Sequence, residues 1–305
     1  MFSYRHAFHA GNHADVLKHM VLVQLLAYLN QKDTPYMVID THAGAGAYML
    51  DSDYATKSGE SDSGIARLWE RDDAPAIVAE YVDLIHAMNP SGRLRHYPGS
   101  PFLAEQVMRE QDRLRLFELH STDIKVLEEN FRKLEAHQAA NGVRTGARGK
   151  RVMIQRADGF AGLRALLPPP SRRGLVLIDP PYEDKDDYRK VKAAIEEAQK
   201  RFATGTYAVW YPVLGRLESQ QLPERLKRVA AGDWLNVTLS VGTLDDERGL
   251  HSSGMFVINP PWTLNAALQQ AMPWLAEVLG REGQGKFTLQ SGSAAKAKPS
   301  KGRDE

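Results

Sequence analysis

The tetrapeptide Asp-Pro-Pro-Tyr at positions 179–182 directly follows an apolar run, Leu-Val-Leu-Ile, at positions 175–178. An exocyclic amine such as adenine N6 is a poor nucleophile, because its lone pair is delocalised into the ring. The carboxylate of Asp179 and the main-chain carbonyl of Pro180 could accept its two N–H bonds and turn the lone pair toward a methyl donor. Tyr182 offers a flat ring on which an extruded base can stack. The motif therefore indicates methyl transfer to an exocyclic amine.

An ordinary turn after a strand is the alternative for this motif, because Asp and Pro both favour turns. The chain also contains a second run of similar form, Asn-Pro-Pro-Trp at positions 259–262, after the apolar residues 255–258. Chain order separates the two. We expect Asp179 to end the fourth strand, beside the first, and Asn259 to end the seventh, in a turn far from the methyl donor.

A cofactor motif is expected near the start of the chain. Residues 36–39 form a short apolar run, and Asp-Thr-His-Ala-Gly-Ala-Gly follows at positions 40–46. Glycines allow a backbone turn to approach a ligand closely, although the third glycine of the dinucleotide fingerprint is absent because position 49 is Met49. Two further predicted strands end at Glu118 and Asp158. Ligands bind at the carboxyl ends of strands in an open α/β sheet, so we expect Glu118 to hold ribose hydroxyls and Asp158 to face an adenine.

Composition narrows the class of protein. The 305 residues are 43% hydrophobic and contain no cysteine, which excludes disulfides, thiolate metal sites and a thiol nucleophile for methylation at pyrimidine carbon. The formal net charge of +1 argues neither for nor against RNA, and local basic clusters matter more. No apolar run has the length of a membrane helix, and the N-terminus has no signal core. We therefore expect a cytoplasmic enzyme with no membrane partner. The basic clusters are Arg144, Arg148, Lys150 and Arg151, then Arg172 and Arg173, and a third at the N-terminus with Tyr4, Arg5, His6, His9 and His13.

The interval between Asp40 and Glu118 is several times the roughly 20 residues of one crossover helix. Apolar residues recur there at helical spacing and predict an amphipathic helix; they are Ile77, Tyr81, Leu84, Ile85 and Met88. We divide the chain into a methyltransferase domain (1–50 and 98–285), a helical insertion (51–97) and a disordered basic tail (286–305). We expect the insertion to lie on the RNA side of the site, with a purely structural role as the alternative.

The N-terminal histidines could suggest zinc, but Gly11 and Asn12 interrupt the spacing between His9 and His13. Asn12 instead predicts a helix N-cap, with Asp15 as its capping partner and a helix from His13 to about Leu29. The carboxylate–histidine pattern of a hydrolytic zinc site is missing, so we expect no metal. The chain also lacks Gly-x-Ser-x-Gly, the nucleophile elbow of a serine hydrolase.

With these residues in view, the chain resembles the bacterial RlmJ-type adenine-N6 methyltransferases of large-subunit ribosomal RNA. The likeness spans nearly the whole chain. It is densest at positions 3–19, Ser-Tyr-Arg-His-Ala-Phe-His-Ala-Gly-Asn-His-Ala-Asp-Val-Leu-Lys-His. It continues through positions 40–46, 97–101, 157–160, 172–174, 179–182, 203–205 and 210–212.

We expect an α/β protein with the Rossmann-like fold of S-adenosylmethionine-dependent methyltransferases: a seven-stranded, mostly parallel sheet with a small helical insertion. The resemblance implies that the substrate is a specific adenine in 23S ribosomal RNA, reached before ribosome assembly is complete. S-adenosylmethionine would be the cofactor and S-adenosylhomocysteine its product, and we expect a monomer. The resemblance assigns cofactor contacts to His19, His42, Ser100, Glu118, Asp158 and Gly159. Lys18 is an additional candidate near the methionine carboxylate, and Tyr4 would touch the target base.

Three other classes stay open on the sequence. The first is an amino methyltransferase acting on DNA adenine, cytosine N4 or protein glutamine, since the Asp-Pro-Pro-Tyr loop is compatible with all of them. The second is a non-catalytic nucleoside- or RNA-binding module, which the presence of Asp179 and both prolines disfavours. The third is a nicotinamide-dependent dehydrogenase, against which the missing third glycine argues.

Overall fold

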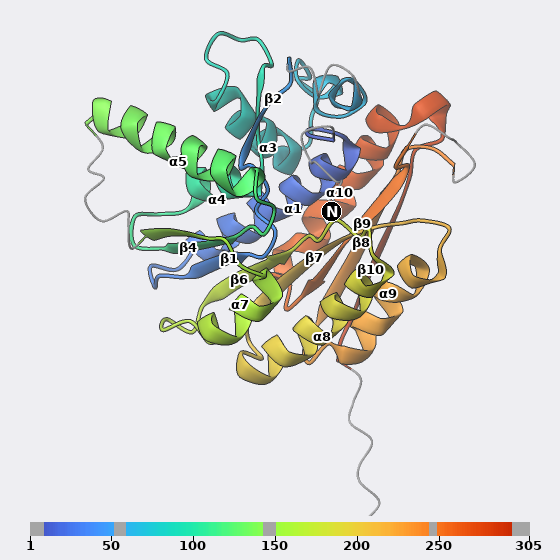
Figure 1. Ribbon diagram of the computed structural model, residues 1–305. Helices are drawn as coiled ribbons and strands as arrows, with labels where there is room; N and C mark the ends of the chain where they lie inside the picture. The colour runs from blue at the N-terminus through green and yellow to red at the C-terminus, as the bar shows by residue number, and fades with distance from the viewer. Residues whose placement is uncertain (1–8, 52–58, 143–150, 244–248, 295–305) are drawn as a thin grey trace, which may run out of the picture.

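The computed structural model describes residues 9–51, 59–142, 151–243 and 249–294. A single large sheet lies between two layers of helices (Figure 1). Its eight strands run in the order β10-β8-β9-β7-β6-β1-β4-β5. Five neighbouring strands pair in parallel: β5 (Val152–Gln155), β4 (Arg113–Phe117), β1 (Met37–Asp40), β6 (Gly174–Ile178) and β7 (Thr206–Pro212). The other three, β8 (Trp234–Ser240), β9 (Ser252–Ile258) and β10 (Lys286–Gly292), join through antiparallel pairs.

The central strands β1 and β6 are buried along their whole length. Strands covered by helices on both faces need apolar side chains in both directions, which explains their continuous apolar runs. The chain leaves β1 toward β4 on one side and returns to β6 on the other, so the strand order reverses at β1. Such a switch point opens a crevice at the carboxyl ends of the strands. Asp40 is the last residue of β1 and Asp179 directly follows the neighbouring strand β6, as predicted.

The Rossmann-like class and the seven expected strands are confirmed, but the sheet has an eighth strand. The expectation of disorder from Lys286 onward is wrong for Lys286–Gly292, which pairs antiparallel with β8. Most of its side chains are exposed, so hydrophobic patterning gives no signal for this strand. Main-chain pairing holds the strand, and the hydroxyls of Thr238 and Thr288 meet at 2.7 Å. Residues 295–305 lie outside the described part.

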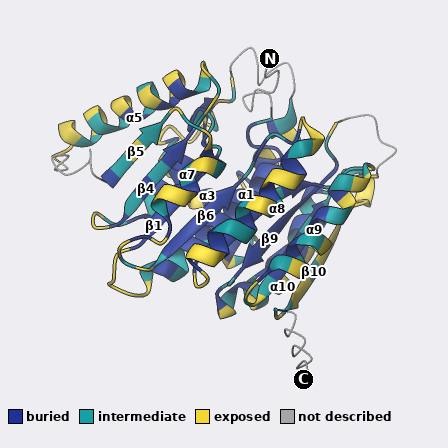
Figure 2. Cartoon of the chain, turned by 60° about the horizontal axis from the view of Figure 1, so that its bottom comes forward, coloured by how far each residue is buried: buried dark blue, intermediate teal, exposed yellow. Residues whose placement is uncertain are grey.

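The two helical layers enclose separate apolar cores, which are dark blue in Figure 2. One layer holds α1 (His13–Asn30), α3 (Ala76–Ala87), α4 (Ser100–Val107), α5 (Asp123–Ala140) and α10 (Trp262–Leu279). The other holds α7 (Gly159–Leu166), α8 (Lys185–Arg201) and α9 (Leu217–Val229). None of the helices in the described ranges is long and apolar enough to cross a membrane.

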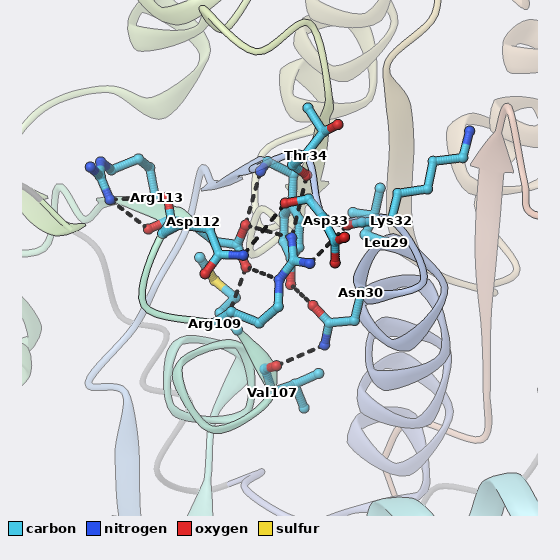
Figure 3. A network of polar contacts seen from close by, with 12 residues as sticks. Leu29, Asn30, Lys32, Asp33, Thr34, Val107, Arg109, Asp112 and Arg113 are labelled. Carbon is cyan, nitrogen blue, oxygen red and sulfur yellow. Dashed lines mark hydrogen bonds and ion pairs between the residues drawn. The ribbon is translucent and has the colours of Figure 1, made fainter.

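Helix α1 begins as the sequence predicts. The Asn12 side chain accepts hydrogen bonds from the backbone N–H groups of Ala14 and Asp15, each at 3.0 Å. Asp15 in turn accepts from the backbone N–H of Gly11 at 2.9 Å. The end of α1 is held by a polar network at the opposite edge of the sheet, where the Asn30 amide donates to the Val107 carbonyl at 2.9 Å (Figure 3). Arg173 donates to the Leu29 carbonyl at 2.7 Å. Helix α1 is therefore fixed at both ends.

The segment between β2 (Ala47–Met49) and β3 (His96–Pro98) contains the 3-10 helices η2 (Glu60–Ser63) and η3 (Ile65–Arg67), followed by α3. The predicted amphipathic helix is confirmed, with Ile77, Tyr81 and Ile85 buried in α3. This segment packs against the beginning of α1. The N–H of Ile65 donates to the Gly11 carbonyl at 2.8 Å. A Cβ at Gly64 would lie 2.1 Å from that carbonyl oxygen, so only glycine fits.

Candidate active site

Two cavities meet at the carboxyl end of β6. The larger, of about 470 Å³, extends along the ends of β1 and β4 and the start of α7. The smaller, of about 260 Å³, lies between the start of α1 and the loops that follow β6 and β7. Four side chains border both cavities: Lys18, Asp179, Pro181 and Glu183. The catalytic candidate Asp179 thus stands where a ligand in one cavity would meet a ligand in the other.

Glu118 lies in the wall of the larger cavity, one residue after β4. Its two oxygens accept backbone hydrogen bonds, from His120 at 2.6 Å and from Gly44 at 2.8 Å. Burial raises the pKa of this carboxyl, while the two backbone donors oppose that rise. Gly44 has a φ of 59°, and a Cβ there would lie 2.5 Å from the Tyr48 hydroxyl. The predicted glycine turn therefore fixes the orientation of Glu118.

Asp158 and Gly159 form the start of α7 on the same cavity. Asp158 Oδ1 caps the helix by accepting from the N–H groups of Phe160 at 2.8 Å and Ala161 at 3.4 Å, and Oδ2 is not used by this cap. A Cβ on Gly159 would lie 2.2 Å from the Thr41 carbonyl, so β1 and α7 approach too closely for any side chain. The side chains of Leu119 and Phe160 add apolar walls that our sequence reasoning did not identify as site residues.

His42 and Ser100 line the larger cavity, and both are held in place by hydrogen bonds to the buried carboxylate of Asp40. The Ser100 hydroxyl donates to Asp40 at 2.6 Å, and the His42 N–H donates to it at 3.1 Å. Burial raises the pKa of Asp40 to about 6. Burial also lowers the pKa of His42 to about 4, so its imidazole is neutral near pH 7. The buried Asp40 organises this loop without lining the cavity.

Helix α1 brings Lys18 and His19 to the site. Lys18 Nζ lies 2.6 Å from Asp179 Oδ2 and 2.9 Å from Asp15 Oδ1. Burial alone would lower the pKa of Lys18, but the two carboxylates raise it above its ordinary value, so the ammonium stays charged. His19 Nδ1 lies 2.8 Å from the Tyr97 hydroxyl. The sequence placed Lys18 among the cofactor contacts and did not predict its pairing with Asp179.

The Asp-Pro-Pro-Tyr loop separates the two cavities. Pro180 lines the larger and Tyr182 the smaller. Tyr182 has a φ of 52° and only 2% of its surface is exposed. Its hydroxyl donates to the Trp210 carbonyl at 2.7 Å, and its ring packs 4.7 Å from that of Tyr188. Little of the Tyr182 ring is open to a stacked base in this arrangement.

The smaller cavity contains residues that the sequence did not single out as a group. Apolar and aromatic side chains form much of its wall, namely Trp210, Pro212, Leu214 and Leu250. His9 and Arg216 supply basic groups. Glu60 of η2 holds this side of the cavity, with His9 Nδ1 2.9 Å from Glu60 Oε1 and the Asn12 amide donating to Oε2 at 2.9 Å. The hydrogen bond to Glu60 raises the pKa of His9.

Several predicted residues lie elsewhere. Tyr4 is outside the described residues. Asn259 follows β9 at the opposite edge of the sheet, where its amide donates to the carbonyls of Ala203 at 2.8 Å and Gly205 at 2.7 Å. The prediction that Asn259 lies in a turn away from Asp179 is confirmed. Trp262 follows it and is 83% exposed.

Of the predicted basic residues that the structure describes, Arg151, Arg172, Arg173 and His13 do not line either cavity, while His9 lines the smaller one. Arg151 pairs with Glu105 at 2.8 Å, and Arg173 donates to carbonyls near the end of α1. Arg144, Arg148 and Lys150 lie outside the described ranges. Among the residues that the structure describes, no group of three histidine or acidic side chains is placed to hold a metal ion.

The strand order, the reversal at β1 and the carboxylates along one sheet edge define the Rossmann-like fold of S-adenosylmethionine-dependent methyltransferases. Comparison with known proteins identifies the family. The family model described as "Ribosomal RNA large subunit methyltransferase D, RlmJ" matches residues 33–291. The chain belongs to this family.

Relatives match over nearly the full length. The chain is 46% identical to the ribosomal RNA large subunit methyltransferase J of Escherichia coli K12, over 95% of this chain and 98% of that protein. It is 45% identical to the Haemophilus influenzae protein of the same name, again over 95% and 98% of the two chains. A crystal structure of a Legionella pneumophila protein superposes with a TM-score of 0.81 at 35% identity, covering 93% of this chain and 98% of that one.

Proposed function

We propose that this protein transfers a methyl group from S-adenosylmethionine to the N6 amine of one adenine in large-subunit (23S) ribosomal RNA. The observation that carries the proposal is the position of Asp179 between two cavities. The larger has the carboxylates and apolar walls suited to a nucleoside cofactor, and the smaller has an apolar wall with the Trp210 ring, which suits a base. The names of the relatives support ribosomal RNA as the substrate.

The residues of the larger cavity fit this cofactor. The fixed carboxylate of Glu118 can accept from two ribose hydroxyls, while Asp158 Oδ2 can accept from the adenine amine. Leu119 and Phe160 border the space for the adenine ring. The methionine end would lie toward Lys18, His19, His42 and Ser100, with Gly159 allowing the close approach of the backbone. When bound, S-adenosylmethionine supplies an electrophilic methyl group on a sulfonium centre.

The base would enter through the smaller cavity. Asp179 and the Pro180 carbonyl would accept the two N–H bonds of the amine and direct its lone pair toward the larger cavity. Once the nitrogen carries the methyl group it is strongly acidic and loses one proton, so no strong base is needed. We assign Tyr182 and Tyr4 to contacts with the base, the former through the small exposed part of its ring.

Methyl transfer from radiolabelled S-adenosylmethionine tests the proposal directly. The substrates are unmodified 23S ribosomal RNA, assembled large subunits, small-subunit RNA and double-stranded DNA. We expect label in free 23S RNA, in a nucleoside that co-migrates with N6-methyladenosine, and little label in assembled subunits. Label that appears only in DNA, or in another nucleoside, would contradict the assignment. Mapping the labelled position then gives a short RNA fragment for further work.

A further inference from the structure

Arg216 lies in the wall of the smaller cavity, directly before α9, and is half-buried. Its Nη1 donates to the Tyr182 carbonyl at 3.4 Å. No carboxylate pairs with its guanidinium within the described ranges. Glu218, the nearest acid along the chain, pairs with Lys185 at 3.6 Å. By contrast, Arg109 and Arg151 each form an ion pair. Among the described residues, the attraction of Arg216 for Glu218 is the weakest of those that lower the pKa of that carboxyl, and no ion pair holds the guanidinium beside the candidate base cavity.

Acidic side chains in the wall of the smaller cavity would repel the phosphates of RNA, so binding of RNA there requires a positively charged side chain. Three carboxylates line it, those of Asp15, Asp179 and Glu183. Lys18 is already held by two of them, at 2.9 and 2.6 Å. A phosphodiester that approaches the rim would meet these acids, and repulsion between like charges would oppose its entry. Among the described residues of the cavity wall, the other basic side chains are Arg216 and His9, and His9 is paired with Glu60.

When the base of a nucleotide enters such a cavity, its phosphates stay outside at the rim, because they are attached to the sugar and not to the base. Arginine suits this position, since its planar fork donates two parallel hydrogen bonds to phosphate oxygens. Phosphate contacts of this kind set the register of a protein on a nucleic acid without reading its sequence. We propose that Arg216 binds a backbone phosphate next to the target adenosine and fixes how deeply the base enters.

The hydrogen bond from Arg216 to the Tyr182 carbonyl connects the proposed phosphate site to the catalytic loop. Arg216 is held by the carbonyl of the residue that ends the Asp-Pro-Pro-Tyr motif, three positions after Asp179. A phosphate on the guanidinium would therefore be positioned by the same loop that positions the acceptor carboxylate. This inference rests on the proposed function, because it presupposes an RNA substrate in the smaller cavity.

The test compares Arg216→Ala with Arg228→Ala. Arg228 lies in the last turn of α9, the helix that Arg216 precedes; it is exposed, and its replacement removes the same charge. Affinity for the short, unmodified RNA fragment that contains the target adenosine is measured across a salt series by filter binding. KM, kcat and the affinity for S-adenosylmethionine are measured alongside it. Arg216→Ala should bind RNA on the order of tenfold more weakly and lower the slope of log K against log salt by about 1. Arg228→Ala should match wild type, and Arg216→Lys should recover part of the loss.

A substituted RNA identifies the phosphate. A neutral methylphosphonate is placed at each position around the target adenosine in turn. At one position it should weaken wild-type binding and abolish the difference between wild type and Arg216→Ala. Equal losses in the Ala variants of Arg216 and Arg228, an unchanged salt slope, or no such position would overturn the proposal. If Arg216→Ala fails to fold, Arg216→Gln carries the same test. Absence of RNA methylation by the wild-type protein would instead reject the proposed function itself.

Discussion

The ammonium of Lys18 lies 2.6 Å from the carboxylate of Asp179 and 2.9 Å from that of Asp15. In this arrangement Lys18 occupies an oxygen of the carboxylate that we assign to the target amine. Asp15 offers the ammonium a second buried partner only one helical turn away. When the amine binds to Asp179, the ammonium of Lys18 would keep its ion pair with Asp15. An unpaired buried ammonium would cost several kcal/mol, and the contact with Asp15 avoids that cost.

Replacing Asp15 by Asn tests this sharing. Lys18 would then have Asp179 as its remaining acidic partner in the described site and would compete more strongly with the substrate amine. We expect kcat to fall on the order of tenfold or more, because the carboxylate of Asp179 is less available to accept a hydrogen bond from the amine. Single-turnover kinetics at saturating S-adenosylmethionine measure the effect, and calorimetry should show little change in cofactor affinity. A variant with unchanged single-turnover rate would argue against a competition between Lys18 and the amine.

Asp179→Ala should abolish turnover while cofactor binding stays largely intact. The loss of one oriented, charge-assisted contact in a preorganised site costs on the order of a hundredfold or more in rate. Asp179→Asn keeps one acceptor oxygen and is expected to retain more activity than the alanine variant. Both are measured by methyl incorporation and by calorimetry with S-adenosylhomocysteine. Methylation by Asp179→Ala at the wild-type rate would exclude the loop at 179–182 from catalysis.

Glu118→Ala should weaken cofactor binding instead. The carboxylate accepts from the N–H groups of Gly44 and His120, and we assign its remaining lone pairs to ribose hydroxyls. Leaving these donors unpaired should cost roughly 1–3 kcal/mol of binding free energy. Calorimetry measures the loss, and the melting temperature of the variant shows whether the glycine turn has loosened. Unchanged affinity for S-adenosylmethionine would mean that Glu118 does not hold the ribose.

The sequence predicted those elements whose residue types have a local physical cause. Buried apolar runs predicted seven strands, and Asn12 with Asp15 predicted the start of α1. It failed where contacts join distant segments. The pairing of Lys18 with Asp179 spans 161 positions and leaves no local pattern. The same holds for Glu60, whose contacts with His9 and Asn12 depend on how the inserted segment packs. Strand β10 was missed because its side chains are mostly exposed and main-chain pairing holds it.

The loop at 259–262 provides a control for the catalytic assignment. Asn259→Ala removes two hydrogen bonds to the carbonyls of Ala203 and Gly205, so we expect a loss of about 1–3 kcal/mol of stability. Trp262→Ala should cost little, because the side chain is 83% exposed. Neither change should alter kcat or cofactor affinity in the folded protein. A selective loss of activity in either variant, at normal cofactor affinity, would contradict the placement of this loop outside the site.

Histidine burial predicts how stability depends on pH. Burial lowers the pKa of His13 to about 4 from an ordinary value of 6.5. The unfolded chain therefore binds a proton between these two pH values while the folded protein does not, so stability falls as the pH drops from 6.5 toward 4. The slope from this group alone is about 1.4 kcal/mol per pH unit.

His13→Gln should flatten the pH dependence of the free energy of unfolding, measured by urea titration at pH 6.5, 5.5 and 4.5. His96→Gln, at an exposed position on β3, is the matched control for a histidine substitution outside the core. Identical slopes for His13→Gln and wild type would show that folding does not lower the pKa of His13.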